Sequence, residues 1–179
     1  MDLNDRRDRN DRRDRSLDER DLDADPIVQF QRWFDEAVAE GVPEPDAMAL
    51  ASVSDDGTPT ARMVLLKAVD QRGFVFYTNY ESEKGRQLAA HPVAALVWRW
   101  YQVRRQVRVT GTVSRVDASE SDAYFATRDR ASQLAAWASP QSQVLADRAA
   151  LDARMAAETA RFSGVVVPRP PWWGGLRVA

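Results

Sequence analysis

Cations and hydroxyls lie close to apolar segments in the middle of the chain. Arg62 and Lys67 flank the apolar run Met63-Val64-Leu65-Leu66, and Phe76-Tyr77-Thr78-Asn79 and Ser82-Glu83-Lys84 follow shortly afterwards. Guanidinium, ammonium and hydroxyl groups are strong donors to phosphate oxygens. Three such groups in quick succession predict a site for a phosphorylated ligand. The alternative is a pair of surface cations around a buried strand, because strict alternation would place Arg62 and Lys67 on opposite faces.

A short helix is expected to begin beside these residues, with Ser82 as its N-cap and its end near Ala90. The N-terminus of a helix offers free N–H groups and a favourable dipole to a phosphate. Lys84 in the first turn opposes the helix dipole, but it favours an anion bound there. Tyr77 and Thr78 end the preceding strand, so we expect them beside the same site.

A third set of polar side chains follows further along the chain. Tyr124, Arg128 and Ser132 are spaced at i, i+4 and i+8, so they share one face if the helix continues through Asp129-Arg130. A phenol, a guanidinium and a hydroxyl together suit a phosphate monoester. The alternative is a solvated helix face with a chance arginine.

Amides could recognise the edge of a heterocycle, since an amide both donates and accepts hydrogen bonds. Gln106 on an expected strand and Gln141-Ser142 after a proline have this character. His91 precedes a proline at an expected helix end, and we interpret it as a loop residue rather than a base. The sequence has no cysteine, no His/Cys cluster for a metal and no glycine-rich phosphate loop.

The composition favours a single globular domain after a charged tail. The 179 residues are 44% hydrophobic, with a formal net charge of −2, so no strong field recruits nucleic acid or an anionic membrane. Residues 1–24 are mostly Asp and Arg and are predicted to be a disordered, nearly charge-balanced tail, followed by one domain over residues 25–179. The charged start and the lack of a long apolar run predict no secretory signal, no membrane span and a cytoplasmic location.

The patterning predicts an α+β, mainly β fold, in which short antiparallel strands form a closed or nearly closed barrel. A first helix should begin at the Asp25-Pro26 cap and end at Gly41. The remaining expected elements alternate short strands with helices: strands at 48–54, 60–69, 74–79, 93–100 and 106–116, helices at 119–127, 132–137 and 146–162, and a last strand from 172.

Taken in this order, the motifs resemble the pyridoxamine 5'-phosphate oxidase family over about residues 21–178. The segments that carry the resemblance are Asp23-Ala24-Asp25-Pro26, Arg62 through Lys67, Phe76-Tyr77-Thr78-Asn79, Arg105-Gln106-Val107, Tyr124-Phe125, Ser132-Gln133, Ala136-Trp137, Gln141-Ser142 and Trp173-Gly174-Gly175. The resemblance implies an antiparallel FMN-binding split barrel with flanking helices, assembled as a homodimer with the flavin at the subunit interface.

The resemblance also implies roles for individual residues. FMN would be bound by Arg62, Met63, Val64, Leu65, Leu66, Lys67, Tyr77, Thr78, Ser82, Lys84, Gln106, Gln141 and Ser142. The substrate phosphate would be bound by Lys67, Tyr124, Arg128 and Ser132. The family reaction oxidises pyridoxamine or pyridoxine 5'-phosphate to pyridoxal 5'-phosphate. A hydride equivalent passes from the substrate C4' carbon to the flavin, and oxygen reoxidises the flavin to give hydrogen peroxide.

The sequence departs from the family pattern in ways that bear on activity. Family members continue into a later Trp-containing strand and an Arg-x-His segment, neither of which precedes Ala179, so we assign no catalytic residue and expect a barrel incomplete at its C-terminus. Glu83 stands where many members have a cation beside the flavin phosphate, and Arg86 could compensate. The tail also lacks a Tyr that usually covers the substrate. Two alternatives therefore stay open: a split-barrel flavoprotein with another substrate, and a non-catalytic binder of FMN or pyridoxal phosphate.

Overall fold

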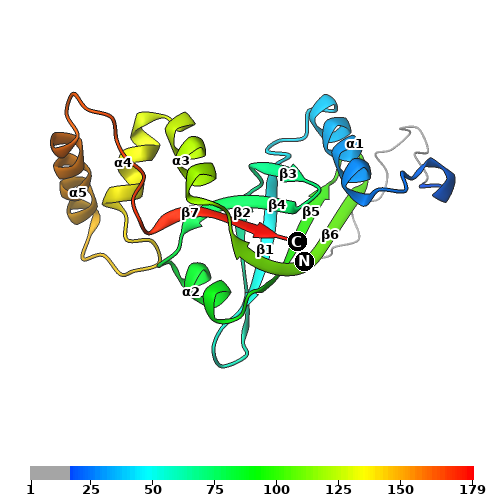
Figure 1. Ribbon diagram of the computed structural model, residues 1–179, viewed down its shortest axis with the longest axis horizontal. Coiled ribbons are helices and arrows are strands. Elements are labelled where there is room, and N and C mark those ends of the chain that lie inside the picture. The colour runs from blue at the N-terminus through cyan, green and yellow to red at the C-terminus, as the bar shows by residue number, and fades with distance from the viewer. Residues whose placement is uncertain (1–16) are drawn as a thin grey trace, which may run out of the picture.

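The computed structural model describes residues 17–179, which form an antiparallel sheet curled into a half-barrel with flanking helices (Figure 1). This confirms the predicted α+β fold. The elements in chain order are a 3₁₀ helix η1 (Glu19–Asp21), α1 (Pro26–Ala39), β1 (Ala47–Val53), β2 (Pro59–Leu65), β3 (Ala68–Asp70), β4 (Gly73–Asn79), α2 (Glu83–Ala90), β5 (Val93–Trp100), β6 (Arg105–Arg115), α3 (Ala118–Thr127), α4 (Arg130–Ala138), α5 (Arg148–Arg161) and β7 (Trp173–Val178).

The strands pair in the order β2-β1-β5-β6-β7-β4-β3 within the described residues. In β1 and β5 every second side chain is buried, as expected for strands with one face on a core. The core contains Met48 and Leu50 from β1 and Leu96 and Trp98 from β5. The curl of the sheet brings β2 close to β4, so residues from both strands can face one pocket.

Helix α1 covers the sheet at the end opposite the other large helices (Figure 1). It begins as predicted, because the Asp25 carboxylate accepts from the Ile27 N–H at 2.8 Å and Pro26 opens the helix. It ends as predicted before Gly41, which has φ +67°. The Phe30 ring packs against Trp98 of the sheet at a centroid distance of 5.0 Å, so burial of this face holds α1 in place.

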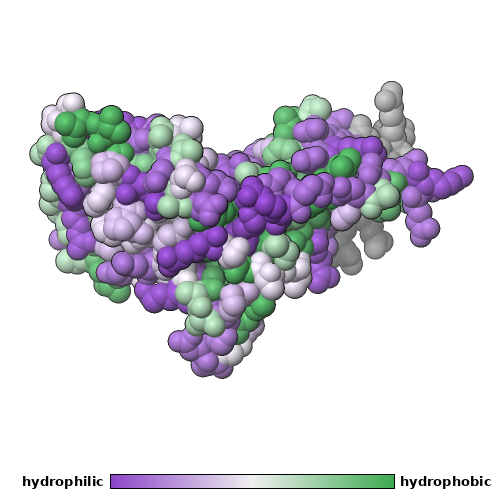
Figure 2. Space-filling model, in the orientation of Figure 1, coloured by the Kyte–Doolittle hydropathy of each residue, from purple (hydrophilic) through white to green (hydrophobic). Residues whose placement is uncertain are grey.

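Helices α3, α4 and α5 gather at the other end of the sheet (Figure 1). Their core is a second apolar cluster formed by Phe125, Leu134, Phe162, Val167 and Trp173. The Trp137 Nε1–H donates to the Pro168 carbonyl at 2.8 Å, which ties α4 to the segment before β7. The face shown in Figure 2 is mostly hydrophilic over the middle of the molecule, with smaller hydrophobic areas towards both ends.

Strand β7 lies between β6 and β4, and all six of its residues are buried. The sequence predicted a bend at the start of a strand for Gly174-Gly175, whereas both glycines lie within β7. A Cβ at Gly174 would stand 2.1 Å from the Tyr80 hydroxyl oxygen, so the close contact requires glycine. Arg177 forms ion pairs with Asp70 at 2.7 Å and Glu120 at 3.1 Å, linking β7 to β3 and α3.

Two predicted elements are interrupted in the structure. The single return strand expected at 60–69 is divided into β2 and β3, because the chain turns at Leu66-Lys67, where the Lys67 N–H donates to the Val75 carbonyl at 2.8 Å. The helix expected to carry Tyr124, Arg128 and Ser132 on one face ends at Thr127, since Arg128 is extended (φ −71°, ψ 147°) and Asp129 caps α4. The predicted tail falls mostly on residues 1–16, outside the described residues, and η1 lies in its remainder.

Candidate flavin and phosphate pocket

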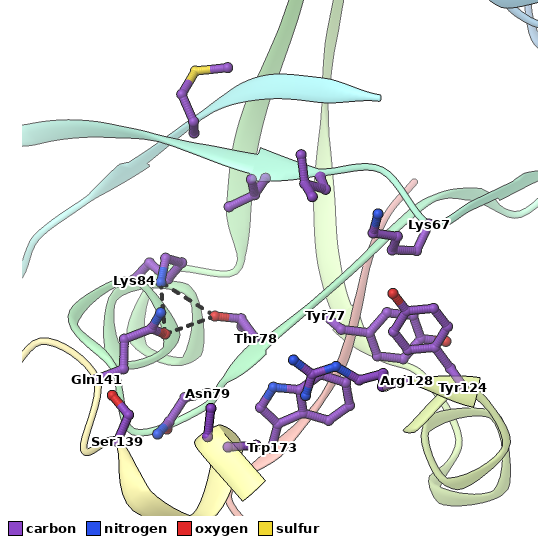
Figure 3. A pocket seen from close by; sticks show the side chains of 15 residues that line it. Lys67, Tyr77, Thr78, Asn79, Lys84, Tyr124, Arg128, Ser139, Gln141 and Trp173 are labelled. Carbon is purple, nitrogen blue, oxygen red and sulfur yellow. Dashed lines mark hydrogen bonds between the residues drawn. The ribbon is translucent and has the colours of Figure 1, made fainter. Parts of the chain in front are cut away.

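A pocket of about 360 Å³ opens where the curled sheet meets α2, α3 and α4 (Figure 3). Lysine or arginine side chains line it, but among the described residues no aspartate or glutamate does. The lining comprises Met63, Val64, Leu65, Lys67, Tyr77, Thr78, Asn79, Lys84, Tyr124, Arg128, Ala135, Ala136, Ser139, Gln141 and Trp173. The chain has only two lysines, and both lie in this lining. The pocket is therefore electropositive and suited to an anionic ligand.

Lys84 is a buried cation whose hydrogen-bond acceptors among residues 17–179 are all neutral oxygens. Its residue is 8% exposed, and its Nζ donates to the Gln141 Oε1 at 3.1 Å and to the Thr78 Oγ1 at 3.3 Å, as Figure 3 shows. Ser82 fixes this position, because its hydroxyl caps α2 by accepting from the Gly85 N–H. Burial lowers the pKa of Lys84, and the nearby charge of Arg62 lowers it further against the opposing effect of Glu83.

Arg62 is also held by neutral acceptors, although it lies outside the pocket lining. Its guanidinium donates to the Ser52 hydroxyl, to the Thr60 Oγ1 at 2.8 Å and to the Gln87 Oε1 at 3.0 Å. Burial lowers its pKa, opposed by the charge of Glu83. Two partly buried cations thus interact with each other, and neither donates to a carboxylate within the described residues. An anion bound beside them would offset both the repulsion between the two cations and the free-energy cost of their desolvation.

Aromatic rings form the wall beside α3. Tyr77 and Tyr124 are stacked with a centroid distance of 3.9 Å and an interplanar angle of 12°. The Trp173 ring lies beside this pair and nearly parallel to it, 5.4 Å from Tyr77 and 6.2 Å from Tyr124. Burial is the main cause that raises the pKa of Tyr77, followed by the charge of Glu120. These rings offer flat apolar surface next to the cations.

Arg128 completes this wall. Its guanidinium lies 4.7 Å from the centroid of Trp173, and burial lowers its pKa. Its Nη1 is buried and has no hydrogen-bond partner in the part of the chain that the structure describes. A buried donor without an acceptor is costly, so this atom indicates a missing acceptor such as a ligand oxygen.

Lys67 differs from the other lining cations because it has a carboxylate partner. It follows the end of β2 and its Nζ lies 2.8 Å from the Asp46 Oδ2. The two side chains are 27% and 28% exposed, so the pair lies at the rim of the pocket. Figure 3 shows the Lys67 ammonium on the side of Tyr77 and Tyr124, away from Lys84.

The pocket brings together ten of the residues proposed from the sequence: Met63, Val64, Leu65, Lys67, Tyr77, Thr78, Lys84, Tyr124, Arg128 and Gln141. It does not include Arg62, Leu66, Ser82, Gln106, Ser132 or Ser142. Leu66 is a core residue, and Ser82 is buried as the α2 cap.

Three more of the residues proposed from the sequence lie outside the pocket lining: Gln106, Ser142 and Ser132. Gln106 pairs with Arg99 across β6 and β5, and Ser142 has φ +64° in the turn after Gln141. Ser132 lies in the first turn of α4, where its N–H donates to Asp129. Arg86, proposed as compensation for Glu83, does not line the pocket either, and its guanidinium donates to the Glu81 carbonyl.

Five further residues line the pocket although the sequence did not point to them as site residues: Asn79, Ala135, Ala136, Ser139 and Trp173. Trp173 was assigned only to a strand start, although its position before two glycines is a signal of close packing. Within residues 17–179 no group of three or more His, Cys, Asp or Glu side chains could hold a metal ion. None of the helices in that range has both the length and the apolar character to cross a membrane.

Comparison with known proteins gives a consistent picture. The sequence profile of the family described as Pyridoxamine 5'-phosphate oxidase matches residues 34–162. A pyridoxine/pyridoxamine 5'-phosphate oxidase from Burkholderia lata is 56% identical over 163 residues, which cover 91% of this chain and 76% of the relative. The enzyme of the same name from Acaryochloris marina is 55% identical, with coverage of 92% and 75%.

Solved structures agree with the sequence relatives on the fold. PhzG from Burkholderia lata, in complex with tetrahydrophenazine-1-carboxylic acid, superposes with a TM-score of 0.85 at 33% identity and covers 92% of this chain and 81% of its own. A pyridoxamine 5'-phosphate oxidase-related, FMN-binding protein from Nostoc punctiforme shares the fold with a TM-score of 0.65 at 18% identity, over 88% of this chain and 82% of its own.

Proposed function

This chain is an oxidoreductase of the pyridoxamine 5'-phosphate oxidase family, and we propose that it binds FMN and oxidises pyridoxamine or pyridoxine 5'-phosphate to pyridoxal 5'-phosphate with oxygen as electron acceptor. The observation that carries the proposal is the distribution of cations around one pocket. One pair, Lys84 and Arg62, is partly buried among neutral oxygens. A second pair, Lys67 and Arg128, lies on the side of Tyr124. Two cationic groups on either side of one pocket fit two phosphorylated ligands.

FMN fits the first group of residues. Lys84 and Arg62 would hold its phosphate, because both carry charge that no carboxylate acceptor neutralises by a hydrogen bond in residues 17–179. Thr78 and Gln141 would contribute polar contacts, while Met63 to Leu65 would pack against the ring. When bound, FMN supplies the redox chemistry by accepting a hydride equivalent from the substrate and passing the electrons to oxygen.

The second group fits the phosphate of the substrate. The buried Nη1 of Arg128 lacks an acceptor, and the Tyr124 ring and Lys67 line the same side of the pocket. Guanidinium and ammonium groups bind a phosphate dianion strongly, and guanidinium can do so with two parallel hydrogen bonds. These residues would orient the pyridine ring towards the flavin, which is how the protein lowers the entropic cost of reaction.

The same proposal includes a cytoplasmic homodimer with the flavin at the subunit interface, and residues 25–179 as its flavin-binding domain. Met63 is 64% exposed on β2 next to the pocket, and burial of such apolar side chains would favour association. In such a dimer, Gln106 and Ser132 would contact the ligands across the subunit interface. Light scattering of the purified protein with and without FMN tests this part.

A second candidate function is oxidation of a cyclic carboxylic acid that carries no phosphate. The structure of PhzG was solved with a tetrahydrophenazine carboxylic acid rather than a phosphate, and the stacked Tyr77, Tyr124 and Trp173 rings would accept several flat ligands. A non-catalytic binder of FMN or pyridoxal phosphate is the third. A requirement for phosphate on the substrate separates the first candidate from the second.

The decisive experiment is an assay of the purified protein. We expect FMN to co-purify or to bind on addition, and pyridoxamine and pyridoxine 5'-phosphate to yield pyridoxal 5'-phosphate and hydrogen peroxide, while unphosphorylated pyridoxine reacts much more slowly. Turnover of a non-phosphorylated ring acid alone would favour the second candidate. FMN binding without turnover of any of these compounds would favour the third.

A further inference from the structure

The lining cations of the pocket differ in their electrostatic partners. Among the described residues Lys84 donates to neutral oxygens, and the Nη1 of Arg128 has no acceptor. Lys67 alone of these three is paired with a carboxylate, at 2.8 Å from the Asp46 Oδ2. Asp46 does not itself line the pocket. It therefore offsets one of the three positive charges from just behind the rim.

Backbone hydrogen bonds fix the two partners next to each other. Asp46 directly precedes β1 and its carbonyl accepts from the Leu66 N–H at 2.8 Å. Lys67 follows β2 and its own N–H donates to Val75 at 2.8 Å. The first residue of β1, Ala47, pairs with the last residue of β2, Leu65. The ends of one strand pair therefore hold the carboxylate beside the ammonium, and the carboxylate stays close when a ligand arrives.

We propose that Asp46 is a specificity-determining residue that competes with the phosphate of the ligand for Lys67. This inference rests on the proposed function, since it takes Lys67 as part of the substrate phosphate site. A dianion that contacts the Lys67 ammonium must displace Asp46 or lie close to its negative charge, and like charges at such distances repel. Asp46 thus weakens the binding of phosphorylated substrate and product alike, and it narrows the preference of the pocket for phosphorylated over unphosphorylated ligands.

Replacement of Asp46 by asparagine tests this role, because asparagine keeps the shape and the backbone contacts but removes the charge. The probe is 4-deoxypyridoxine 5'-phosphate, which carries the phosphate but has a methyl group at the oxidised position, so it is neither substrate nor aldehyde. Its affinity for the FMN-saturated protein is measured by calorimetry and compared with that of 4-deoxypyridoxine. We expect Asp46→Asn to bind the phosphorylated probe about fivefold more tightly, the effect of a partly exposed ion pair, and the unphosphorylated probe equally.

Three further substitutions isolate the mechanism. In the Lys67→Met background, Asp46→Asn should increase the affinity much less, because the competition for the ammonium group is lost and only direct repulsion of the phosphate remains. The control is Asp55→Asn, whose side chain is 89% exposed in the β1–β2 turn region away from the pocket lining, and it should leave both affinities unchanged. Asp46→Ser serves as a second charge-removing variant in case the asparagine variant unfolds.

The outcomes separate the inference from the function on which it rests. If the unmodified protein binds the phosphorylated probe no better than the unphosphorylated one, the phosphate site and the proposed function fail together with the inference. If the unmodified protein prefers the phosphorylated probe but Asp46→Asn and Asp46→Ser do not bind it more tightly, the inference alone is overturned. Equal tightening in the Lys67→Met background also overturns it.

Discussion

Substitution of Lys84 by methionine should make the apoprotein no less stable while it weakens FMN binding. Methionine replaces the buried ammonium with an apolar side chain of similar length. The two effects should have opposite signs if, as proposed, Lys84 binds the FMN phosphate and its buried charge does not stabilise the fold. This contrast distinguishes a binding residue from a structural one in a single variant.

The effect on stability follows from the surroundings of the ammonium group. Lys84 is 8% exposed and donates to Gln141 and Thr78, both neutral. Removing a buried charge that has no carboxylate partner in the described residues relieves a desolvation cost of about 2–4 kcal/mol, and the two lost hydrogen bonds offset about 1 kcal/mol each. We therefore expect a gain of about 0–2 kcal/mol, which corresponds to a rise in Tm of up to about 6 °C for a chain of this size.

The stability difference should also depend on pH. Burial lowers the pKa of Lys84 in the folded protein below its ordinary value, so the unfolded chain binds the proton more tightly. The cost of the buried charge is therefore fully present below the folded pKa and is relieved as the pH rises towards the ordinary value. The advantage of Lys84→Met over the unmodified protein should be largest near neutral pH and shrink in alkaline buffer.

The effect on FMN follows from the loss of one charged donor to phosphate. Such a hydrogen bond contributes about 1.5–3 kcal/mol, which corresponds to a Kd increase of about 10- to 150-fold. Flavin fluorescence titrations with FMN and with riboflavin measure this effect, and riboflavin, which lacks the phosphate, should bind both proteins equally. A fall in apoprotein Tm of several degrees, or an equal loss of FMN and riboflavin affinity, would refute the reasoning.

Three other substitutions, with one control, test the remaining features. Glu83→Arg should tighten FMN binding several-fold, because the Glu83 carboxylate acts electrostatically on both Arg62 and Lys84; unchanged affinity in the same titration contradicts this. Arg128→Lys should raise KM for the phosphorylated substrate about tenfold or more, since lysine loses the fork that binds two oxygens, with little change for unphosphorylated pyridoxine. Arg177→Met should lower the free energy of unfolding by about 2 kcal/mol, measured by urea denaturation, whereas Arg148→Met, which breaks the exposed pair with Asp152, should change it by less than about 0.5 kcal/mol.

Elements with local signals were predictable from the sequence. Asp25 and Ser82 cap their helices as expected, because capping depends on residues within one turn. The first hairpin turns at Gly57, which has φ +86°, as the Asp-Gly pair indicates. Lys84 stood out because a cation in the first turn opposes the helix dipole, and the structure places it in the pocket lining.

Features that depend on distant contacts were not predictable in this way. The break in the strand at Lys67 depends on a hydrogen bond to Val75 of another strand. The Asp129 cap that separates α3 from α4 is a local signal that the sequence reasoning overlooked, whereas the contact of Arg128 with Trp173 of β7 is a distant one. Asp46 lies 21 residues before its partner. The periodicity of the sequence does not predict contacts between distant residues. The position of Trp173 in the pocket and the pairing of Asp46 with Lys67 were therefore visible only in the structure.

The presence of both lysines of the chain in one pocket has a practical consequence. Apart from the α-amino group, reagents that acylate or reductively alkylate primary amines can modify only these two side chains, because the arginines and the single histidine carry no primary amine. Lys67 at the rim should react before the buried Lys84. A mass spectrum of the intact protein after brief labelling gives the number of labels added. Fewer labels in the presence of a ligand would therefore show that the ligand covers the pocket.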